Sequence, residues 1–190
     1  MTAVAVSMPG NVELSTPRLI LRPWRMEDAE TLYSLASDPE IGTTAGWKPH
    51  SSVEESRNII STVFTEPDVF AIVLRTSNTP IGCVGLNHDP RVLRKGKNDA
   101  EIGYWVGRRY WGQGFATEAV REIIRYAFED LAITKIWCQS SEDNMRSANV
   151  QDKCGFKFDH MGLFENPYLG EVVTAVSSLS RRDWIRHLNN

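Results

Sequence analysis

The sequence predicts a single domain of the α/β or α+β class with a mixed sheet, and two observations carry the prediction. The chain has 190 residues, of which 42% are hydrophobic, enough for one domain with a substantial core. Its strand-like and helix-like segments also have a characteristic order, with antiparallel-type strands first and a strand–helix–strand–helix–strand series after them. We expect a loose tail at residues 1–13 and the domain at residues 14–188.

The first quarter of the chain predicts a strand, a helix and a loop. Residues 19–22 are mostly apolar and predict a short strand that ends at Pro23. Residues 27–37 carry apolar side chains at helical spacing and predict a helix, which the Asp38-Pro39 step closes. Residues 42–50 are rich in glycine, threonine and tryptophan and predict a loop.

A second helix and two strands follow. Ser52 and Glu55 have the spacing of a capping box and predict a helix that runs through about residue 65. Residues 69–74 and 81–86 predict two strands joined by a hairpin-type turn. A longer polar loop at residues 88–98 then leads to the next strand.

The most informative segment is a glycine-bearing turn between a strand and a helix. Residues 100–106 are strand-like, and residues 116–131 have the apolar spacing of an amphipathic helix. Gly112 and Gly114 lie in the turn, where glycine permits positive φ and close backbone approach. The first N–H groups of the helix have no intrahelical partner and carry partial positive charge. We therefore expect the turn to bind phosphate groups.

Two common phosphate-binding motifs do not match this turn. A P-loop has a lysine directly after its last glycine, and none follows Gly114. A dinucleotide-binding fingerprint needs a further glycine or alanine and an acidic residue about 20 positions on, outside the helix. The nearby Glu129 and Asp130 still belong to the predicted helix. An ordinary glycine turn that caps a surface helix is the alternative interpretation.

Four blocks of sequence carry a resemblance to a known superfamily. Residues 109–114 read Arg-x-x-Gly-x-Gly and resemble the pyrophosphate loop of the GNAT N-acetyltransferases. Residues 144–156 read Asn-x-x-Ser-x-x-x-x-x-Lys-x-Gly-Phe and are similar to the RimJ/RimL branch, the ribosomal-protein N-terminal acetyltransferases and their relatives. The opening at residues 16–23 and the strand-like run at 173–179, which leads to Trp184, match as well. The resemblance covers roughly residues 14–184.

The resemblance implies a fold, a cofactor and a reaction. The fold would be a central, mostly antiparallel, twisted sheet flanked by helices, with one splayed pair of strands. The reaction would move an acetyl group from acetyl-CoA to a primary amine by direct attack in a ternary complex. The acyl-pantetheine arm would lie along the strand before the phosphate turn, where one backbone N–H polarises the acetyl carbonyl.

The resemblance also implies a set of cofactor-binding residues. Asn144 would bind the pantetheine arm, whereas Asn149 and Lys153 would either reach the nucleotide or face solvent. The full set is Tyr104, Trp105, Val106, Arg109, Tyr110, Trp111, Gly112, Gln113, Gly114, Phe115, Ala116, Thr117, Asn144, Asn149 and Lys153.

Glu101 is the candidate general base. It shares a strand face with Trp105, and several family members carry a basic carboxylate near the start of this strand. A solvated or ion-paired carboxylate at the strand end is the alternative interpretation. His88, Asp89 and Glu165 are rival bases.

Ser147 is the candidate general acid for the leaving thiolate. Many GNAT members use a tyrosine on the late helix, but Gln151 occupies that position here. The RimJ/RimL resemblance assigns the role to Ser147 instead. The alternative is that Ser147 satisfies a backbone N–H at a helix N-terminus, as serine often does.

Composition limits the partners that we expect. The net charge is −3 and the basic residues are dispersed, which does not indicate a nucleic-acid partner. No stretch approaches the roughly 18 consecutive apolar residues of a membrane span, and residues 1–10 lack the features of a secretion signal. Three cysteines without metal-ligand spacing indicate reduced thiols. We expect a cytoplasmic monomer or homodimer that binds no nucleic acid, membrane or metal.

The acceptor amine is less well defined than the cofactor. The RimJ/RimL resemblance favours the N-terminal α-amine of a protein or peptide. A small-molecule amine such as an antibiotic, polyamine or amino acid is the alternative, and a non-catalytic CoA-binding module is a further one. We expect three loops, residues 41–50, 87–98 and 161–170, to shape the acceptor site as an open groove, with a closed small-molecule pocket walled by Trp47 and Tyr168 as the alternative.

Overall fold

The structure, a computed structural model, describes residues 12–89, 96–166 and 168–189. The strands are β1 (Leu14–Ser15), β2 (Leu19–Arg22), β3 (Val69–Leu74), β4 (Thr79–Asn87), β5 (Asp99–Val106), β6 (Lys135–Ser141), β7 (Lys157–Asn166) and β8 (Gly170–Ser180). The helices are α1 (Ala29–Ala36), α2 (Pro39–Ala45), α3 (Val53–Thr62), α4 (Phe115–Glu129), α5 (Met145–Lys153) and α6 (Arg181–Leu188). Short 3-10 helices, η1 (Met26–Asp28) and η2 (Arg108–Tyr110), precede α1 and α4. In the described part of the chain, none of the helices has the length and apolar character that crossing a bilayer requires.

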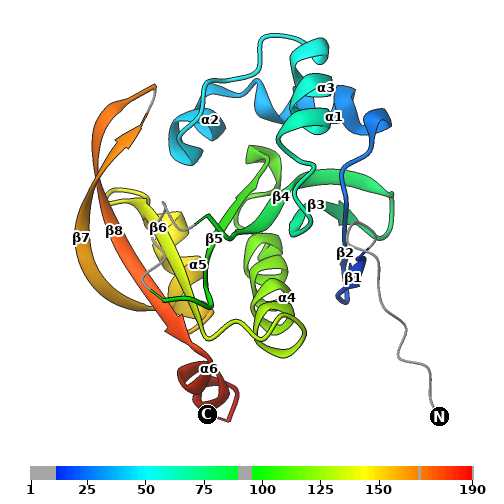
Figure 1. The fold of residues 1–190 in the computed structure, drawn as a ribbon. Helices are drawn as coiled ribbons and strands as arrows, with labels where there is room; N and C mark the ends of the chain where they lie inside the picture. The colour runs from blue at the N-terminus through cyan, green and yellow to red at the C-terminus, as the bar shows by residue number, and fades with distance from the viewer. Residues whose placement is uncertain (1–11, 90–95, 167, 190) are drawn as a thin grey trace, which may run out of the picture.

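The eight strands form one mixed sheet. Their order is β1-β2-β3-β4-β5-β6-β8-β7, and every neighbouring pair is antiparallel except β5 and β6. Helices α1 to α3 lie on one side of the sheet and α4 on the other (Figure 1), while α5 packs beside α4 and β6. This arrangement confirms the predicted mostly antiparallel sheet flanked by helices.

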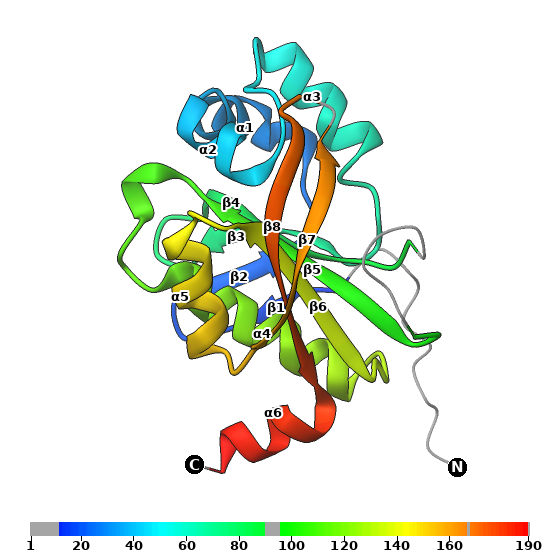
Figure 2. The ribbon, with the colours of Figure 1, turned by 90° about the vertical axis from the view of Figure 1, so that its left-hand side faces the viewer.

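The parallel pair β5–β6 is splayed. The two strands are in register at only three positions, where Asp99–Glu101 face Lys135–Trp137. Beyond this point β5 stays paired with β4 as far as Val106, whereas β6 stays paired with β8 as far as Ser141. The second halves of the two strands therefore diverge (Figure 1), and the edge of β5 that faces β6 is open over residues 102–106. Figure 2 shows the sheet from the side of β7 and β8, which lie in front of β5 in that view.

The sheet separates two hydrophobic clusters. The larger one joins the apolar stripe of α4, including Val120 and Ile124, to alternate residues of β5 such as Ile102. The smaller one joins Leu32 of α1 and Ile60 of α3 to the opposite face of the sheet. The alternation along β5 sends Trp105 to this second face, because neighbouring residues of a strand point to opposite sides. Each face of β5 thus packs against a different hydrophobic cluster.

One segment that the sequence predicts as a loop is a helix. Residues 39–45 form α2, which overlaps the loop predicted at residues 42–50. Asp38 caps the helix by accepting a hydrogen bond from the Glu40 N–H at 3.0 Å, and Pro39 occupies the first turn. Gly46 ends α2 with a φ of +80°, a conformation that favours glycine. The Asp38-Pro39 step, read as the end of α1, is also the start of α2.

The second predicted loop that differs is residues 161–170. Most of it belongs to strands, because β7 continues to Asn166 and β8 begins at Gly170. The edge strand β7 exposes both of its faces, so Leu163 and Phe164 are exposed next to each other. Its sequence therefore lacks the alternation of apolar and polar residues that predicts a half-buried strand. The predicted loop at residues 88–98 lies partly outside the described residues.

Candidate active site

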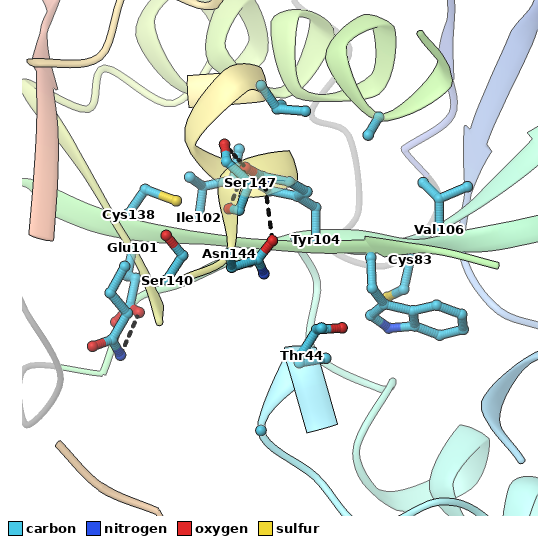
Figure 3. Close-up of a pocket in the computed structure, with 18 of the residues that line it drawn as sticks. Thr44, Cys83, Glu101, Ile102, Tyr104, Val106, Cys138, Ser140, Asn144 and Ser147 are labelled. Carbon is cyan, nitrogen blue, oxygen red and sulfur yellow. Dashed lines mark hydrogen bonds between the residues drawn. The ribbon is translucent and has the colours of Figure 1, made fainter. Parts of the chain in front are cut away.

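A large cavity lies where β5 and β6 diverge. Its volume is about 1420 Å³, larger than the roughly 300–1,000 Å³ typical of a site for one small ligand. Its walls come from α2, β5, the start of α4, α5 and the β7–β8 hairpin. Figure 3 shows Ser147 on one side of β5 and Thr44 of α2 on the other. The cavity therefore reaches both faces of the sheet and has room for two ligands.

The glycine turn forms one end of the cavity. Gly112 and Gly114 have φ values of +73° and +79°, as expected for glycines in a sharp turn. A Cβ on Gly112 would meet no described atom within 4 Å, and one on Gly114 would meet only Arg18 Nη2 at 3.5 Å. Gly114 is also the N-cap of α4, where no side chain from the described residues caps the first turn. The first N–H groups of α4 thus adjoin an open space suited to an anion.

Arg18, the residue just before β2, holds this turn in place. Its guanidinium donates to Glu118 Oε2 at 2.6 Å and to the Gln113 carbonyl at 2.9 Å, and lies 4.4 Å from the centre of the Phe115 ring. Burial opposes ionisation of Glu118, but hydrogen bonds from Thr16 and Arg18 outweigh it and lower the pKa of this carboxyl. Arg18 belongs to the opening block that carries the family resemblance, but sequence reasoning assigned it no role.

Most of the predicted cofactor residues line the cavity. Those that do are Tyr104, Trp105, Val106, Tyr110, Trp111, Gly112, Gly114, Phe115, Ala116, Thr117, Asn144, Asn149 and Lys153. Arg109 and Gln113 are not among the lining residues of the described chain. Gln113 donates to the Arg109 carbonyl at 3.0 Å, and the Arg109 guanidinium lies over the Tyr110 ring. These two residues therefore hold the turn together from outside the cavity.

The residue that caps α5 is Asn144 rather than Ser147. The Asn144 side-chain oxygen accepts a hydrogen bond from the Ser147 N–H at 3.1 Å. The Ser147 hydroxyl is used differently, because its oxygen lies 2.9 Å from Tyr104 Oη and accepts from Gln151 Nε2 at 3.1 Å (Figure 3). The helix-cap interpretation of Ser147 is therefore wrong, and its hydroxyl lines the cavity.

Sequence reasoning missed this hydroxyl cluster. The sequence predicted a cofactor contact for Tyr104 and no role for Gln151, which occupies the position of a tyrosine in many family members. Gln151 is four positions after Ser147 on one helix, a spacing that places two side chains on the same face. That spacing was the available signal for Gln151. The contact of Tyr104 with α5 joins residues 43 positions apart and had no local signal.

Glu101 lies at the closed end of the splay. It pairs with Trp137, the last position at which β5 and β6 share a ladder. Its Oε1 accepts a hydrogen bond from Gln139 Nε2 at 3.1 Å, and the half-buried side chain lines the cavity. The carboxylate is thus directed to the cavity by a partner on β6.

The rival bases occupy different positions. His88 and Asp89 line the cavity, whereas Glu165 is not among its lining residues in the described chain. His88 Nε2 is 2.7 Å from Asp68 Oδ2, and Asp68 Oδ1 accepts from the Tyr126 hydroxyl at 3.0 Å. His88 is therefore held by a buried carboxylate and is not a freely solvated loop histidine.

At the far end of the cavity, Gly46 at the end of α2 contacts Asn166 at the end of β7. The buried Asn166 donates from Nδ2 to the Gly46 carbonyl at 2.8 Å, across 120 positions of sequence. Its Oδ1 accepts from the N–H groups of Tyr168 and Leu169 and so shapes the hairpin tip. Trp47, which follows Gly46 in the chain, packs edge-on against Trp105 at 5.7 Å between ring centroids. Trp47 lines the cavity as expected, but Tyr168 is 61% exposed and is not a lining residue of the described chain.

The three cysteines are buried and free. Burial raises the pKa of Cys154 to about 11 and that of Cys83 to about 12, and it raises the pKa of Cys138 as well. All three thiols are therefore protonated at neutral pH, and a protonated thiol is a poor nucleophile.

Comparison with known proteins gives a consistent set of similarities. Residues 18–157 match the family described as "Acetyltransferase (GNAT) domain". "Uncharacterized N-acetyltransferase p20" of Bacillus licheniformis is 32% identical over 149 residues, which cover 76% of this chain and 82% of that protein.

Two solved structures, both from Vibrio cholerae, have the same fold. One carries the provisional name ribosomal-protein-serine acetyltransferase and has a TM-score of 0.74 at 25% identity, covering 91% of this chain and 99% of that one. The other is a spermidine N-acetyltransferase in complex with CoA and spermine, with a TM-score of 0.73 at 18% identity and coverage of 90% and 99%.

Proposed function

Because this chain belongs to the GNAT family of acetyltransferases, and is an acetyl-CoA-dependent enzyme, we propose that it acetylates the N-terminal α-amine of a protein or peptide. The acetyl group would pass directly to the amine while both substrates are bound. The protonated state of the three cysteines supports direct transfer, because none of them offers a thiolate that could carry the acetyl group.

The cavity fits the coenzyme at two places. The open turn at Gly112 and Gly114, together with the first N–H groups of α4, would hold the pyrophosphate. The open edge of β5 over residues 102–106 would bind the extended pantetheine arm through backbone groups. Arg18 holds the turn in place through its hydrogen bond to the Gln113 carbonyl. Asn144, fixed as the cap of α5, adjoins the same opening.

The side chains around the opening suit the proton transfers of acyl transfer. Acetyl-CoA supplies the acetyl group as a reactive thioester. A β5 N–H near Trp105 would donate to the acetyl carbonyl, Ser147 would protonate the leaving sulfur, and Glu101 would accept the proton that the amine loses. Glu101 and Ser147 lie on opposite sides of β5 (Figure 3), so base and acid would stand on opposite sides of the transferred group.

The contact between Asn166 and Gly46 carries the choice of acceptor. It joins α2 to the hairpin across the acceptor end of the cavity, so we propose that an acceptor enters end-on. A chain terminus can enter in this way. An internal lysine cannot, because the peptide chain continues on both sides of it. The indoles of Trp47 and Trp105, which meet edge-on, would form an aromatic wall for a small first side chain.

The chemistry of the α-amine agrees with this geometry. Its pKa of about 7.7–8.0 leaves a sizeable neutral fraction at pH 7, whereas a lysine amine has a pKa of about 10.4. An α-amine therefore demands less of Glu101 as a base. The provisional name of the 25%-identical Vibrio cholerae structure supports the same class of acceptor.

Mass spectrometry of a mixed acceptor panel tests this proposal. The panel contains short peptides that begin with Ala or Ser, the same peptides with a blocked α-amine and one free lysine, polyamines, aminoglycosides and free amino acids. We expect acetylation of the free α-amine peptides and little reaction with the blocked ones. Acetylation confined to the small amines would overturn the peptide proposal and favour a small-molecule acetyltransferase. CoA binding without release of free thiol from any amine would favour a non-catalytic module.

Asn166→Asp tests the end-on entry. The aspartate keeps an oxygen for the Tyr168 and Leu169 N–H groups but loses the donor to Gly46, so the hairpin tip stays formed while its contact with α2 is lost. We expect blocked peptides with an internal lysine to become substrates, with the KM for acetyl-CoA unchanged.

Tyr168→Phe is the matched control for this variant, because it alters the same tip at an exposed side chain outside the cavity. An Asn166→Asp enzyme that still rejects every internal lysine would contradict end-on entry.

A further inference from the structure

The Tyr104 side chain crosses from β5 to α5 and ends beside Ser147. Its hydroxyl oxygen is 2.9 Å from Ser147 Oγ and 3.2 Å from the Ser147 carbonyl oxygen (Figure 3). Gln151 Nε2 donates to the same Oγ at 3.1 Å and also lies 3.3 Å from Ser140 Oγ. Two side chains, one from β5 and one from α5, therefore converge on the Ser147 hydroxyl.

The number of donors and acceptors limits where the Ser147 proton can point. A serine hydroxyl has one proton and two lone pairs. Gln151 reaches Oγ through an amide nitrogen, which can only donate, so it occupies one lone pair. If Tyr104 donates to the other lone pair, neither neighbour is an acceptor for the Ser147 proton. That proton then points into the cavity.

A second hydrogen arrangement is geometrically possible and has the opposite effect. Tyr104 could donate to the Ser147 carbonyl at 3.2 Å and accept the Ser147 proton on its own oxygen. In that arrangement the proton points away from the cavity. The 2.9 Å contact fits a proton on either oxygen, but for the Tyr104 proton Oγ is the nearer acceptor, because the Ser147 carbonyl oxygen is 3.2 Å away. A sulfur atom in the cavity that accepts the Ser147 proton would complete the first arrangement. Burial raises the pKa of Tyr104, so the phenol keeps the proton that this donation requires.

We propose that Tyr104 is a positioning residue that turns the Ser147 proton toward the leaving sulfur. The proposal rests on the acid role of Ser147 given above. The amine nitrogen bonds to the acyl carbon and the C–S bond breaks, and the electron pair of that bond goes to sulfur, which takes the proton from Ser147 Oγ. Tyr104 and Gln151 donate to the oxygen that remains and stabilise its charge. The proton that the amine loses to Glu101 returns to Ser147 through solvent, so the enzyme is unchanged after each cycle.

A double-mutant cycle tests the proposal. We expect Tyr104→Phe to lower kcat about tenfold, the loss typical of one directed hydrogen bond, and to leave the KM for acetyl-CoA nearly unchanged. In a Ser147→Ala background the same change should have almost no effect on kcat, because residues that act through one group are not additive. Tyr33→Phe, which removes a hydroxyl on α1 outside the cavity, is the matched control and should match the unaltered enzyme.

Gln151→Met provides a second route to the same readout. It removes the other donor with little change in side-chain volume, and we expect a fall in kcat that again disappears in the Ser147→Ala background. Thermal unfolding of every variant separates loss of folding from loss of positioning.

Three outcomes would overturn the proposal, and each points to a different cause. If the effects of Tyr104→Phe and Ser147→Ala multiply, Tyr104 acts independently of Ser147. If Tyr104→Phe raises the KM for acetyl-CoA and spares kcat, its role is in binding. If Ser147→Ala alone is silent, Ser147 is not the acid, and the proposed mechanism fails together with the role of Tyr104.

Discussion

Replacing Ser147 with alanine is expected to lower kcat about 100-fold, the loss typical of a removed acid–base group, while the KM for acetyl-CoA stays nearly constant. The reason is geometric, since the Ser147 hydroxyl lines the cavity and is held by Tyr104 and Gln151. Release of free thiol from acetyl-CoA, followed with a saturating acceptor, measures kcat directly. The melting temperature should change little, because Asn144 and not Ser147 caps α5.

Ser147→Thr is the matched variant for this prediction. Threonine keeps a hydroxyl at the position, so much more activity should survive than in the alanine variant. A loss of only a few fold in Ser147→Ala would show that another group protonates the sulfur. Equal losses of kcat in both variants would show that the reaction depends on the shape of the side chain at position 147 and not on its hydroxyl.

Replacing Gly114 with valine is expected to weaken acetyl-CoA binding by at least about tenfold, or about 1.4 kcal/mol. The φ of +79° at Gly114 disfavours any side chain, and a β-branched one would also fill the space in front of the α4 N–H groups. Isothermal titration calorimetry with CoA measures the loss. The strained backbone should cost about 1–3 kcal/mol of stability as well, so the variant should melt at a lower temperature.

Gly170→Val separates backbone strain from coenzyme binding. Gly170 has a φ of +73°, and a Cβ there would meet no described atom within 4 Å, so the strain resembles that at Gly114. Gly170 lies at the start of β8, outside the residues that line the cavity in the described chain. We expect its variant to lose stability but to bind CoA normally. Unchanged CoA binding in both variants would mean that the turn does not hold the pyrophosphate.

The sequence predicted those parts of the fold in which local pattern and tertiary environment agree. Residues 19–22 and 69–74 match strands β2 and β3 at both ends, because they are apolar runs buried in the sheet. The amphipathic stripe predicted α4 to within two residues at each end. Strand β7 has no such pattern, since most of its side chains are exposed. Only its pairing with β8 makes it a strand.

The same distinction holds for the candidate site. The coenzyme end depends on consecutive backbone groups of one turn and one strand, so a short stretch of sequence contains it. The acceptor end depends on contacts between distant segments, such as Asn166 with Gly46 and His88 with Asp68. No spacing within one element predicts such contacts. The hydroxyl cluster of Ser147, Tyr104 and Gln151 is intermediate, because Gln151 is close to Ser147 in sequence and Tyr104 is far from it.

The divergence of β5 and β6 divides the sheet into two parts, β1 to β5 and β6 to β8, which share a ladder at only three positions. An extended pantetheine arm that bonds to the open edge of β5 would act as a missing strand and make the two parts one continuous sheet. The amide hydrogens of residues 102–106 should then exchange more slowly with solvent when CoA is present. The wall of the cavity that the amine contacts would also be complete only after acetyl-CoA is bound. We therefore expect ordered kinetics, in which acetyl-CoA binds first and CoA leaves last.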